Sequence, residues 1–206
     1  MEVFEYQTGP LRVNTYLVCD ETKEAFLVDP GSYLKQITNK VIEKELNLKY
    51  IVLTHGHGDH IGGIAQFKAD FPDAKVVALD LEKETLGDPV LNNSAVILGG
   101  KIAMDADLYV HDGETLQVGN MDLKIVATPG HTPGGMSILL EDIVFCGDTL
   151  FKGSIGRFDM PGGDYLTLID SIKSKLFTLP DETKVYPGHN GKTTIGWEKK
   201  HNPFVG

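Results

Sequence analysis

Residues 54–60 read Thr-His-Gly-His-Gly-Asp-His, which places three imidazoles and one carboxylate within six residues. Core packing does not call for four metal-capable groups in so short a stretch, because such groups are ordinarily exposed or singly paired. The two intervening glycines remove side-chain bulk and allow tight bends. In a locally extended backbone the first two histidines project to the same side, and the aspartate and the last histidine lie past the bend. One short loop can therefore contribute to two neighbouring metal sites through His55, His57, Asp59 and His60.

Three later segments each place a histidine or an aspartate beside glycine, just after a predicted strand. They are Thr128-Pro129-Gly130-His131, Cys146-Gly147-Asp148 and Pro187-Gly188-His189. A single histidine in such a position is more often a capping or hydrogen-bonding residue than a metal ligand. The cluster at 55–60 favours the ligand interpretation, because two metals need more ligands than one loop supplies. We therefore predict that His131, Asp148 and His189 meet that loop at one edge of a sheet.

The rest of the chain alternates between strand and helix patterns, which predicts mixed sheets with helices outside them. Ser32 is a plausible N-cap for the first long helix, and Gly87 and Pro89 should interrupt the segment 81–98. We predict strands at 3–7, 13–19, 25–28, 50–53, 75–78, 121–127, 136–140, 143–146 and 184–186, and helical segments at 33–46, 81–98, 166–177 and 194–201, with a further one beginning at Ile61.

The length and the net charge of the chain favour one domain and argue against some classes of partner. The 206 residues suit one domain spanning 1–206. A formal net charge of -10 argues against a broad nucleic-acid or anionic-membrane surface. The sequence contains no 18-residue apolar stretch of the kind that predicts a membrane-spanning helix. The two cysteines, Cys19 and Cys146, form no close pair, so we expect a reducing cytoplasm.

On these motifs the sequence resembles the metallo-β-lactamase superfamily. The HxHxDH signature of that family matches residues 55–60, and His131, Asp148 and His189 follow in the family's order. The resemblance covers nearly the whole chain. It implies an α+β fold, an αββα sandwich in which two mixed β-sheets pack face to face with helices on the outside.

The resemblance also implies a set of metal ligands. One metal would be held by His55, His57 and His131, the other by Asp59, His60 and His189, and Asp148 would bridge them. Asp29 matches a family position near the metals, where it would support a ligand; a simple turn residue is the alternative. We expect two divalent ions, with zinc as the first expectation, although iron or manganese suits the same donors.

Within the superfamily, the chain is most similar to glyoxalase II-like thioesterases, and in particular to a shorter bacterial set. The segment Gly147-Asp148-Thr149-Leu150-Phe151, followed by Gly156-Arg157-Phe158, carries this resemblance. It implies hydrolysis of S-(2-hydroxyacyl)glutathione or a related small-molecule thioester by a hydroxide that two metals share. Asp59 and Asp148 would be the catalytic carboxylates, with Asp59 orienting the nucleophile.

Two departures leave the thiol carrier open. The sequence ends at Gly206, so we expect it to lack the C-terminal helical region that supplies glutathione-binding basic residues in full-length glyoxalase II. Asp159 stands where that group usually has a substrate-contacting tyrosine. Arg157 is our first candidate for binding a substrate carboxylate and Lys152 a weaker one. For Arg157 the alternative is an ordinary solvated loop charge.

Three other functions are compatible with the same scaffold. A persulfide dioxygenase uses a similar scaffold with a single iron, and a lactone or ester hydrolase would use the same nucleophile. A catalytically silent scaffold is the non-enzyme alternative, but the loss of ligands that would mark it is not seen.

Two branches of the superfamily do not match the sequence. The flavodiiron branch has glutamate where His57 stands, and the best-known zinc β-lactamases have cysteine in place of Asp148. We interpret Cys146 as a small core residue.

Overall fold

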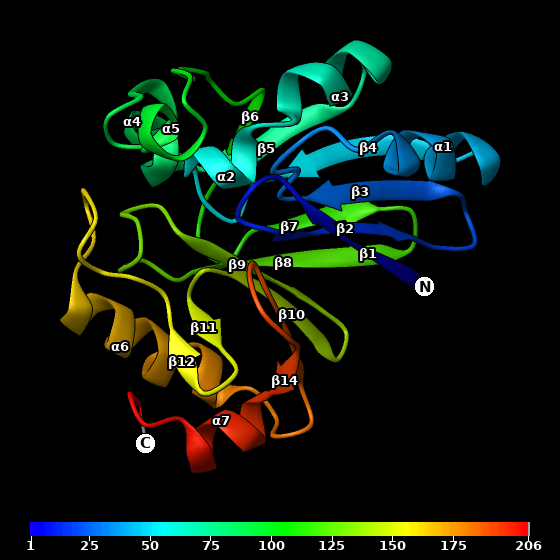
Figure 1. Cartoon of the computed structure of the whole chain (residues 1–206). Helices are drawn as coiled ribbons and strands as arrows, with labels where there is room; N and C mark the ends of the chain where they lie inside the picture. Colours follow the sequence, from blue (N-terminus) through cyan, green and yellow to red (C-terminus); the bar gives the residue numbers. More distant parts are fainter. Residues whose placement is uncertain (206) are drawn as a thin grey trace.

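The computed structural model describes residues 1–205 as four layers, with two six-stranded sheets face to face at the centre and helices on both outer sides (Figure 1). The first sheet begins as an antiparallel meander and continues as parallel strands. Its strands, in order across the sheet, are β1 (Glu2–Thr8), β2 (Val13–Cys19), β3 (Glu24–Val28), β4 (Asn47–Val52), β5 (Lys75–Leu79) and β6 (Leu108–Val110).

The second sheet is mixed as well. Its strands, in order across the sheet, are β14 (Thr193–Thr194), β13 (Lys184–Pro187), β10 (Ile143–Gly147), β9 (Met136–Leu140), β8 (Met121–Ala127) and β7 (Thr115–Val118). β10 and β13 are parallel, and β8 and β10 run in one direction because both are antiparallel to β9. A small hairpin of β11 (Leu150–Phe151) and β12 (Ser154–Ile155) follows β10.

Helices cover the outer face of each sheet (Figure 1). α1 (Lys35–Glu43) and α3 (Ile64–Asp70) lie over the first sheet, and α6 (Tyr165–Ser174) and α7 (Ile195–His201) lie over the second. The shorter helical elements are α2 (Gly58–Ile61), the 3₁₀ turn η1 (Asp80–Glu82), α4 (Lys83–Gly87), α5 (Ser94–Ile97) and the 3₁₀ turn η2 (Leu176–Thr178). No helix within residues 1–205 has the length and apolar character needed to span a membrane.

Strand alternation explains why three apolar layers form. Successive side chains of a strand face opposite sides, so one strand can serve two layers. Val18 and Phe145 face the core between the sheets, whereas their neighbours Leu17 and Val144 pack under the outer helices. Because both faces of each sheet are covered, strands such as β2 and β10 are buried along their whole length.

The structure confirms the predicted fold class and most predicted elements, and it corrects three details. The first long helix begins after Leu34, not Ser32, because the chain at Pro30 is hydrogen-bonded to Gly63 and has not yet turned into a helix. That helix also ends at Glu43, not at 46, because Glu45 adopts a left-handed conformation, with φ at 54°, that turns the chain into β4. The short strands β6, β7, β11, β12 and β14 were not predicted.

Candidate metal centre

Seven metal-capable side chains gather at the edge where strands of both sheets end. The carboxyl ends of parallel strands share one edge of a sheet, so residues just after these strands are delivered to one place. The loop after β4 and the short helix α2 that follows it supply two side chains each, and the loops after β8, β10 and β13 supply one each. They are His55, His57, Asp59, His60, His131, Asp148 and His189.

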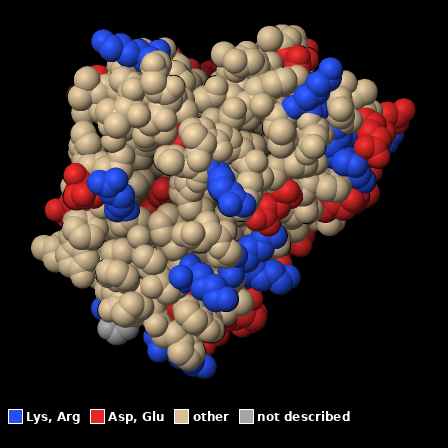
Figure 2. Space-filling view, in the orientation of Figure 1, with Lys and Arg blue, Asp and Glu red and all other residues tan. Residues whose placement is uncertain are grey.

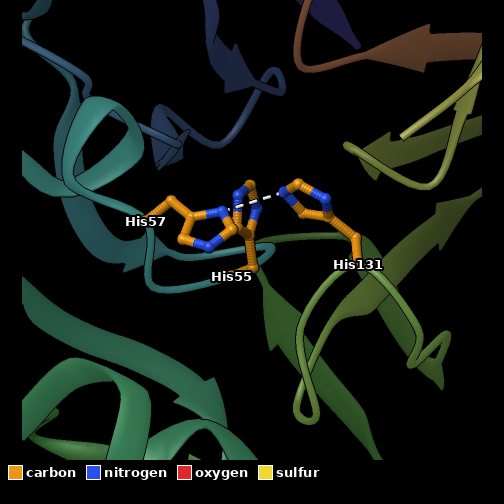
Figure 3. A group of neighbouring side chains, drawn as sticks. All are labelled: His55, His57 and His131. Carbon is orange, nitrogen blue, oxygen red and sulfur yellow. Dashed lines mark hydrogen bonds between the residues drawn. The ribbon is translucent and has the colours of Figure 1, made fainter. Parts of the chain in front are cut away.

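The first group consists of three buried histidines, His55, His57 and His131. One ring nitrogen from each lies within 4.8 Å of the others. Figure 3 shows His55 and His57 on the loop after β4 and His131 on the loop after β8, with the three rings turned toward one another. His57 Nδ1 lies only 2.9 Å from His131 Nε2. Two sheets therefore contribute to one three-nitrogen site.

The second group consists of Asp59, His60 and His189, whose donor atoms also lie within 4.8 Å of one another. Asp59 Oδ2 is 3.2 Å from His189 Nε2 and 3.8 Å from His60 Nε2. Asp59 and His60 are on α2, and His189 follows β13. This group again joins the two sheets.

Asp148 lies between the two groups. Its Oδ2 is 3.7 Å from His131 Nε2 in the first group and 3.6 Å from His189 Nε2 in the second, and its Oδ1 is 3.4 Å from His60 Nε2. A carboxylate in this place can bind two cations at once. The structure thus brings together all seven residues predicted as ligands, in the two groups predicted from the resemblance.

Four of the five histidines have their other ring nitrogen held by a neighbouring oxygen. Such contacts fix the ring and the tautomer of a metal-binding histidine. They are His55 Nδ1 with Thr54 Oγ1 at 3.1 Å, His60 Nδ1 with Asp29 Oδ2 at 2.9 Å, His131 Nδ1 with the Arg157 carbonyl at 2.6 Å, and His189 Nδ1 with the Leu11 carbonyl at 3.2 Å. The Nε2 atoms of these four rings are left to face the cluster.

Unpartnered buried atoms test whether this set fits a metal. Within residues 1–205, His55 Nε2, His57 Nε2, His60 Nε2 and Asp148 Oδ1 are buried and have no hydrogen-bond partner. Leaving a buried polar atom unpaired costs about 1–3 kcal/mol. Imidazole nitrogens and carboxylate oxygens are the donors that first-row divalent cations take, so bound cations would satisfy these atoms.

The pKa values of the clustered side chains also favour metal binding. Burial lowers the pKa of His55, His57 and His131, that of His57 to about 3, so their rings are neutral and offer lone pairs. Burial works in the opposite direction on Asp59 and Asp148, but the His60 imidazole beside them keeps the pKa of both carboxyl groups low. Burial also acts to lower the pKa of His60 and His189, but the carboxylates of Asp148 and Asp59 raise the pKa of both rings above its ordinary value, so these two would release a proton on binding a cation. Three neutral imidazoles and two ionised carboxylates are already in the form that binds a cation.

Asp29 stands behind His60, outside the seven. It follows β3 in the left-handed region, with φ at 47°. Its Oδ1 accepts from the Thr54 amide at 2.8 Å, and its Oδ2 accepts from the Thr54 hydroxyl at 2.6 Å and contacts His60 Nδ1. Asp29 therefore fixes both the start of the ligand loop and one ligand ring.

Glu82 is a second buried carboxylate near the cluster, and the sequence analysis missed it. It is 0 % exposed. Burial raises its pKa to about 7, although hydrogen bonds from Gly56, Thr132 and Gly134 lower it. The signal that could have found it is its position just past β5, whose carboxyl end shares an edge with that of β4.

A cavity of about 550 Å³ opens over the metal-capable side chains. His57, Asp59, His131, Asp148 and His189 face it. Apolar side chains form much of its remaining wall, from the turn between β1 and β2, from α5 and from the segment 151–160. They are Leu11, Val96, Ile97, Phe151, Ile155 and Met160.

The two predicted substrate-binding residues lie in different places. Arg157 lines the cavity, but its Nε and Nη2 atoms each donate to a carboxylate oxygen of Asp159 at 2.9 Å. Lys152 belongs to a separate depression, where its Nζ lies 5.8 Å from the centre of the Trp197 ring. The structure therefore brings Arg157 to the cluster and leaves Lys152 outside its cavity.

The chain is similar to proteins of a known family over most of its length. Residues 8–189 match the family model of the Metallo-beta-lactamase superfamily, and all seven clustered residues lie in that range. The hydroxyacylglutathione hydrolase GloC of Haemophilus influenzae is 36% identical over 93% of this chain and 92% of its own.

Solved structures agree in fold over nearly the whole chain. The crystal structure of BLEG-1 B3 metallo-beta-lactamase matches with a TM-score of 0.92 and 36% identity and covers 99% of both chains. The structure of TTHA1623 in a di-iron-bound form matches with a TM-score of 0.83 and 33% identity, covering 98% of this chain and 100% of that one.

Proposed function

This chain belongs to the metallo-beta-lactamase superfamily, and we propose that it is a two-metal hydrolase that cleaves thioesters of the S-(2-hydroxyacyl)glutathione type. One observation carries the proposal: two groups of three donors share the carboxylate of Asp148. Zinc is the expected metal, and the di-iron form of a structural relative keeps iron as an alternative.

The residues of the cluster divide the catalytic work. Two divalent cations held by these residues would lower the pKa of a water molecule and polarise a substrate carbonyl. Asp148 holds the two groups in a fixed relation, since its carboxylate lies within 3.7 Å of a histidine of each. Asp59 faces the cavity beside His189, where its carboxylate would orient the nucleophile.

The leaving group decides between substrate classes. A thiol has a reference pKa of about 8.5, so it departs without a strong general acid. None of the seven clustered residues is free to act as such an acid while it binds metal. The GloC relative is named a hydroxyacylglutathione hydrolase, which also supports a thioester as the substrate. Arg157 is the proposed contact for a substrate carboxylate, which would have to replace Asp159 on its guanidinium.

The charge distribution supports a small-molecule substrate. Lysine and arginine side chains lie among acidic ones on the face shown in Figure 2, and the most prominent basic group in that view, near β14, has acidic side chains beside it. Together with the net charge of -10, this supports our proposal that the chain binds neither nucleic acid nor anionic membranes.

The cysteines support our proposal for the compartment. Cys19 and Cys146 are both free thiols, as expected in a reducing compartment such as the cytoplasm.

The test is hydrolysis of S-lactoylglutathione by the protein reconstituted with zinc, iron or manganese. We expect thiol release, and we expect Asp148→Asn to reduce kcat by at least about 100-fold, the scale that loss of one electrostatic group in an active site reaches. Arg157→Gln should raise KM for this anionic substrate and leave kcat nearly unchanged. Turnover that persists in Asp148→Asn would refute the two-metal mechanism.

Parallel assays separate the alternatives. A β-lactam is included because of the TM-score of 0.92 to BLEG-1, and a lactone because the same nucleophile attacks it. Oxygen consumption with a glutathione persulfide and one iron would indicate a persulfide dioxygenase, against which the complete second group argues. Absence of turnover with all of these substrates, with two metals bound, would favour a catalytically silent scaffold.

A further inference from the structure

We propose that Glu82 is a positioning residue that sets the geometry of the three-histidine site, His55, His57 and His131. The inference rests on the proposed two-metal site, but its test reads metal affinity and does not require a substrate. Glu82 is fully buried on the turn η1 and contacts none of the seven clustered side chains through its carboxylate hydrogen bonds.

The carboxylate of Glu82 ties together the two loops that carry these histidines. Its Oε1 accepts from the Gly56 amide at 2.8 Å, and Gly56 lies between His55 and His57. Its Oε2 accepts from the Thr132 hydroxyl at 3.0 Å and the Gly134 amide at 2.8 Å, just after His131. One side chain from the edge of the first sheet therefore fixes the distance between ligands of the first sheet and a ligand of the second.

The chemistry of this contact requires an acid. Three donors converge on two oxygens, and a carboxylate can accept from all of them, whereas a glutamine would direct its NH₂ group at one or two of them. The packing around the contact is also close. A Cβ on Gly56 would lie 3.1 Å from Glu82 Oε1, and one on Gly134 would lie 2.6 Å from Glu82 Cα. The two loops therefore approach Glu82 as closely as their glycines permit.

The second metal group has its own buried carboxylate. Asp29 contacts the ring of His60 directly and that of His55 only through Thr54, and it reaches neither Gly56 nor the loop after β8. Within residues 1–205, Glu82 in turn makes no hydrogen bond to α2, which carries Asp59 and His60, or to the segment that carries His189. Loss of Glu82 should therefore weaken metal binding at the three-histidine site, whereas loss of Asp29 should weaken mainly the site that contains His60.

The experiment is zinc titration of the metal-free protein by calorimetry, repeated with cobalt(II) and read by its visible absorption. We expect Glu82→Gln to weaken one of two metal equivalents by about 10- to 100-fold and to spare the other, because outer contacts of ligands have effects of this size. Asp29→Asn should weaken mainly the other equivalent, because Asp29 contacts His60 directly and His55 only through Thr54. In the double variant both equivalents weaken if the two carboxylates serve different sites, and one stays tight if they serve the same site.

Glu198 provides a matched control. It is also 0 % exposed, and its carboxylate accepts from Gly153, Thr193 and Asn202 in the region of α7. Glu198→Gln should lower Tm as Glu82→Gln does, without changing either zinc equivalent or the cobalt spectrum. Equal losses of Tm with zinc affinity unchanged in both variants would overturn the proposal.

A milder variant guards against loss of folding. Thr132→Val removes one of the three donors to Glu82 and keeps the acid in place. It should weaken the same equivalent as Glu82→Gln, by a smaller factor. An unchanged zinc affinity in folded Thr132→Val and Glu82→Gln proteins would show that Glu82 only stabilises the fold. Failure of thioester hydrolysis, by contrast, would leave these titrations and their interpretation intact.

Discussion

Each ligand loop in the cluster combines a local motif with a contact from elsewhere in the chain. His60 is one of four metal-capable residues in a short segment, and its ring is held by Asp29, which lies 31 positions earlier. His131 follows β8, and the carbonyl of Arg157, 26 positions later, accepts from its ring. A ligand can thus be recognised from its own segment, whereas its orientation depends on distant residues.

The two cysteines allow a prediction at this scale. Cys146 is 0 % exposed beneath α6, and burial raises the pKa of its thiol to about 12. Cys19 is 2 % exposed, and burial raises its pKa as well. Since the thiolate is the reactive form, iodoacetamide at pH 8 should label neither residue in the folded protein and both in urea. Mass spectrometry measures this, and rapid labelling of Cys146 in the native state would contradict the burial described here.

The burial of Cys146 confirms the sequence prediction of a core residue, and Glu82 shows why other site residues escaped prediction. The clustered ligands were found because metal chemistry concentrates rare residue types in a few positions. Glu82 has no such signature, since its partners Gly56, Thr132 and Gly134 are up to 52 positions away. Asp159 was noted as a departure, but its pairing with Arg157 needed the structure.

At the scale of elements, the cluster depends on strands that end together. β3, β4 and β5 are parallel neighbours, and their carboxyl ends deliver Asp29, the 55–60 loop and Glu82. Strand positions were predicted well because apolar runs bounded by turn residues are local signals. The missed strands β11, β12 and β14 have only two residues each, too few for any period to show.

Helix α6 supports the loop of His131 from outside. The Asp164 amide donates to the Gly130 carbonyl at 2.8 Å, and the Ser171 hydroxyl donates to the Pro129 carbonyl at 2.6 Å. Asp164 is also the N-cap of α6, where its side chain accepts from the Thr167 amide at 2.7 Å. The start of α6 and the start of the ligand loop are therefore one structural unit.

Removing this cap should destabilise the protein in a pH-dependent way. We expect Asp164→Ala to lower Tm at pH 7 by roughly 2–4 °C, since a lost N-cap has effects of this order. The hydrogen bond from Thr167 lowers the pKa of Asp164 in the folded protein. Its stabilisation is therefore fully present above the unfolded value of about 3.9 and is lost as pH falls through the folded one.

Scanning calorimetry of the parent and Asp164→Ala proteins between pH 7 and pH 3 tests this. The two Tm values should converge toward the acid end. Thr194→Ala, which removes the N-cap hydroxyl of α7 that accepts from the Trp197 amide, is the control, because its effect should not depend on pH in this way. A difference that stays constant down to pH 3 would argue against the charged cap.

At the scale of the whole molecule, neither sheet can bury its inner face alone. The central core contains Phe26 and Val52 from the first sheet beside Ile138 and Phe145 from the second. Phe26 and Phe145 meet edge to face, with ring centres 6.2 Å apart. For this reason we propose that residues 1–206 fold as one cooperative domain, and we expect a single thermal transition.

The metal cluster adds a second connection between the sheets. Four of its residues follow β4 of the first sheet and three follow strands of the second, and each group of donors takes members from both. The folded state alone presents these donors together, so bound metal stabilises it by mass action. At a free metal concentration 1,000 times Kd, one site contributes about 4 kcal/mol. For a chain of this length, that should raise Tm by roughly 10 °C or more.

Removal of metal should therefore lower Tm by a similar amount, and a return of zinc should restore it. Chelator-treated and zinc-reconstituted protein would be compared by scanning calorimetry. Asp148→Asn should show a smaller increment, because its carboxylate contacts both groups. His111→Ala is the matched control, since this histidine is 64% exposed and pairs with Asp80 outside the cluster, so its increment should equal that of the parent. If zinc left Tm unchanged in the parent, the cluster would not join the two sheets through metal, and the tight core between them would have to hold the seven donors together by itself.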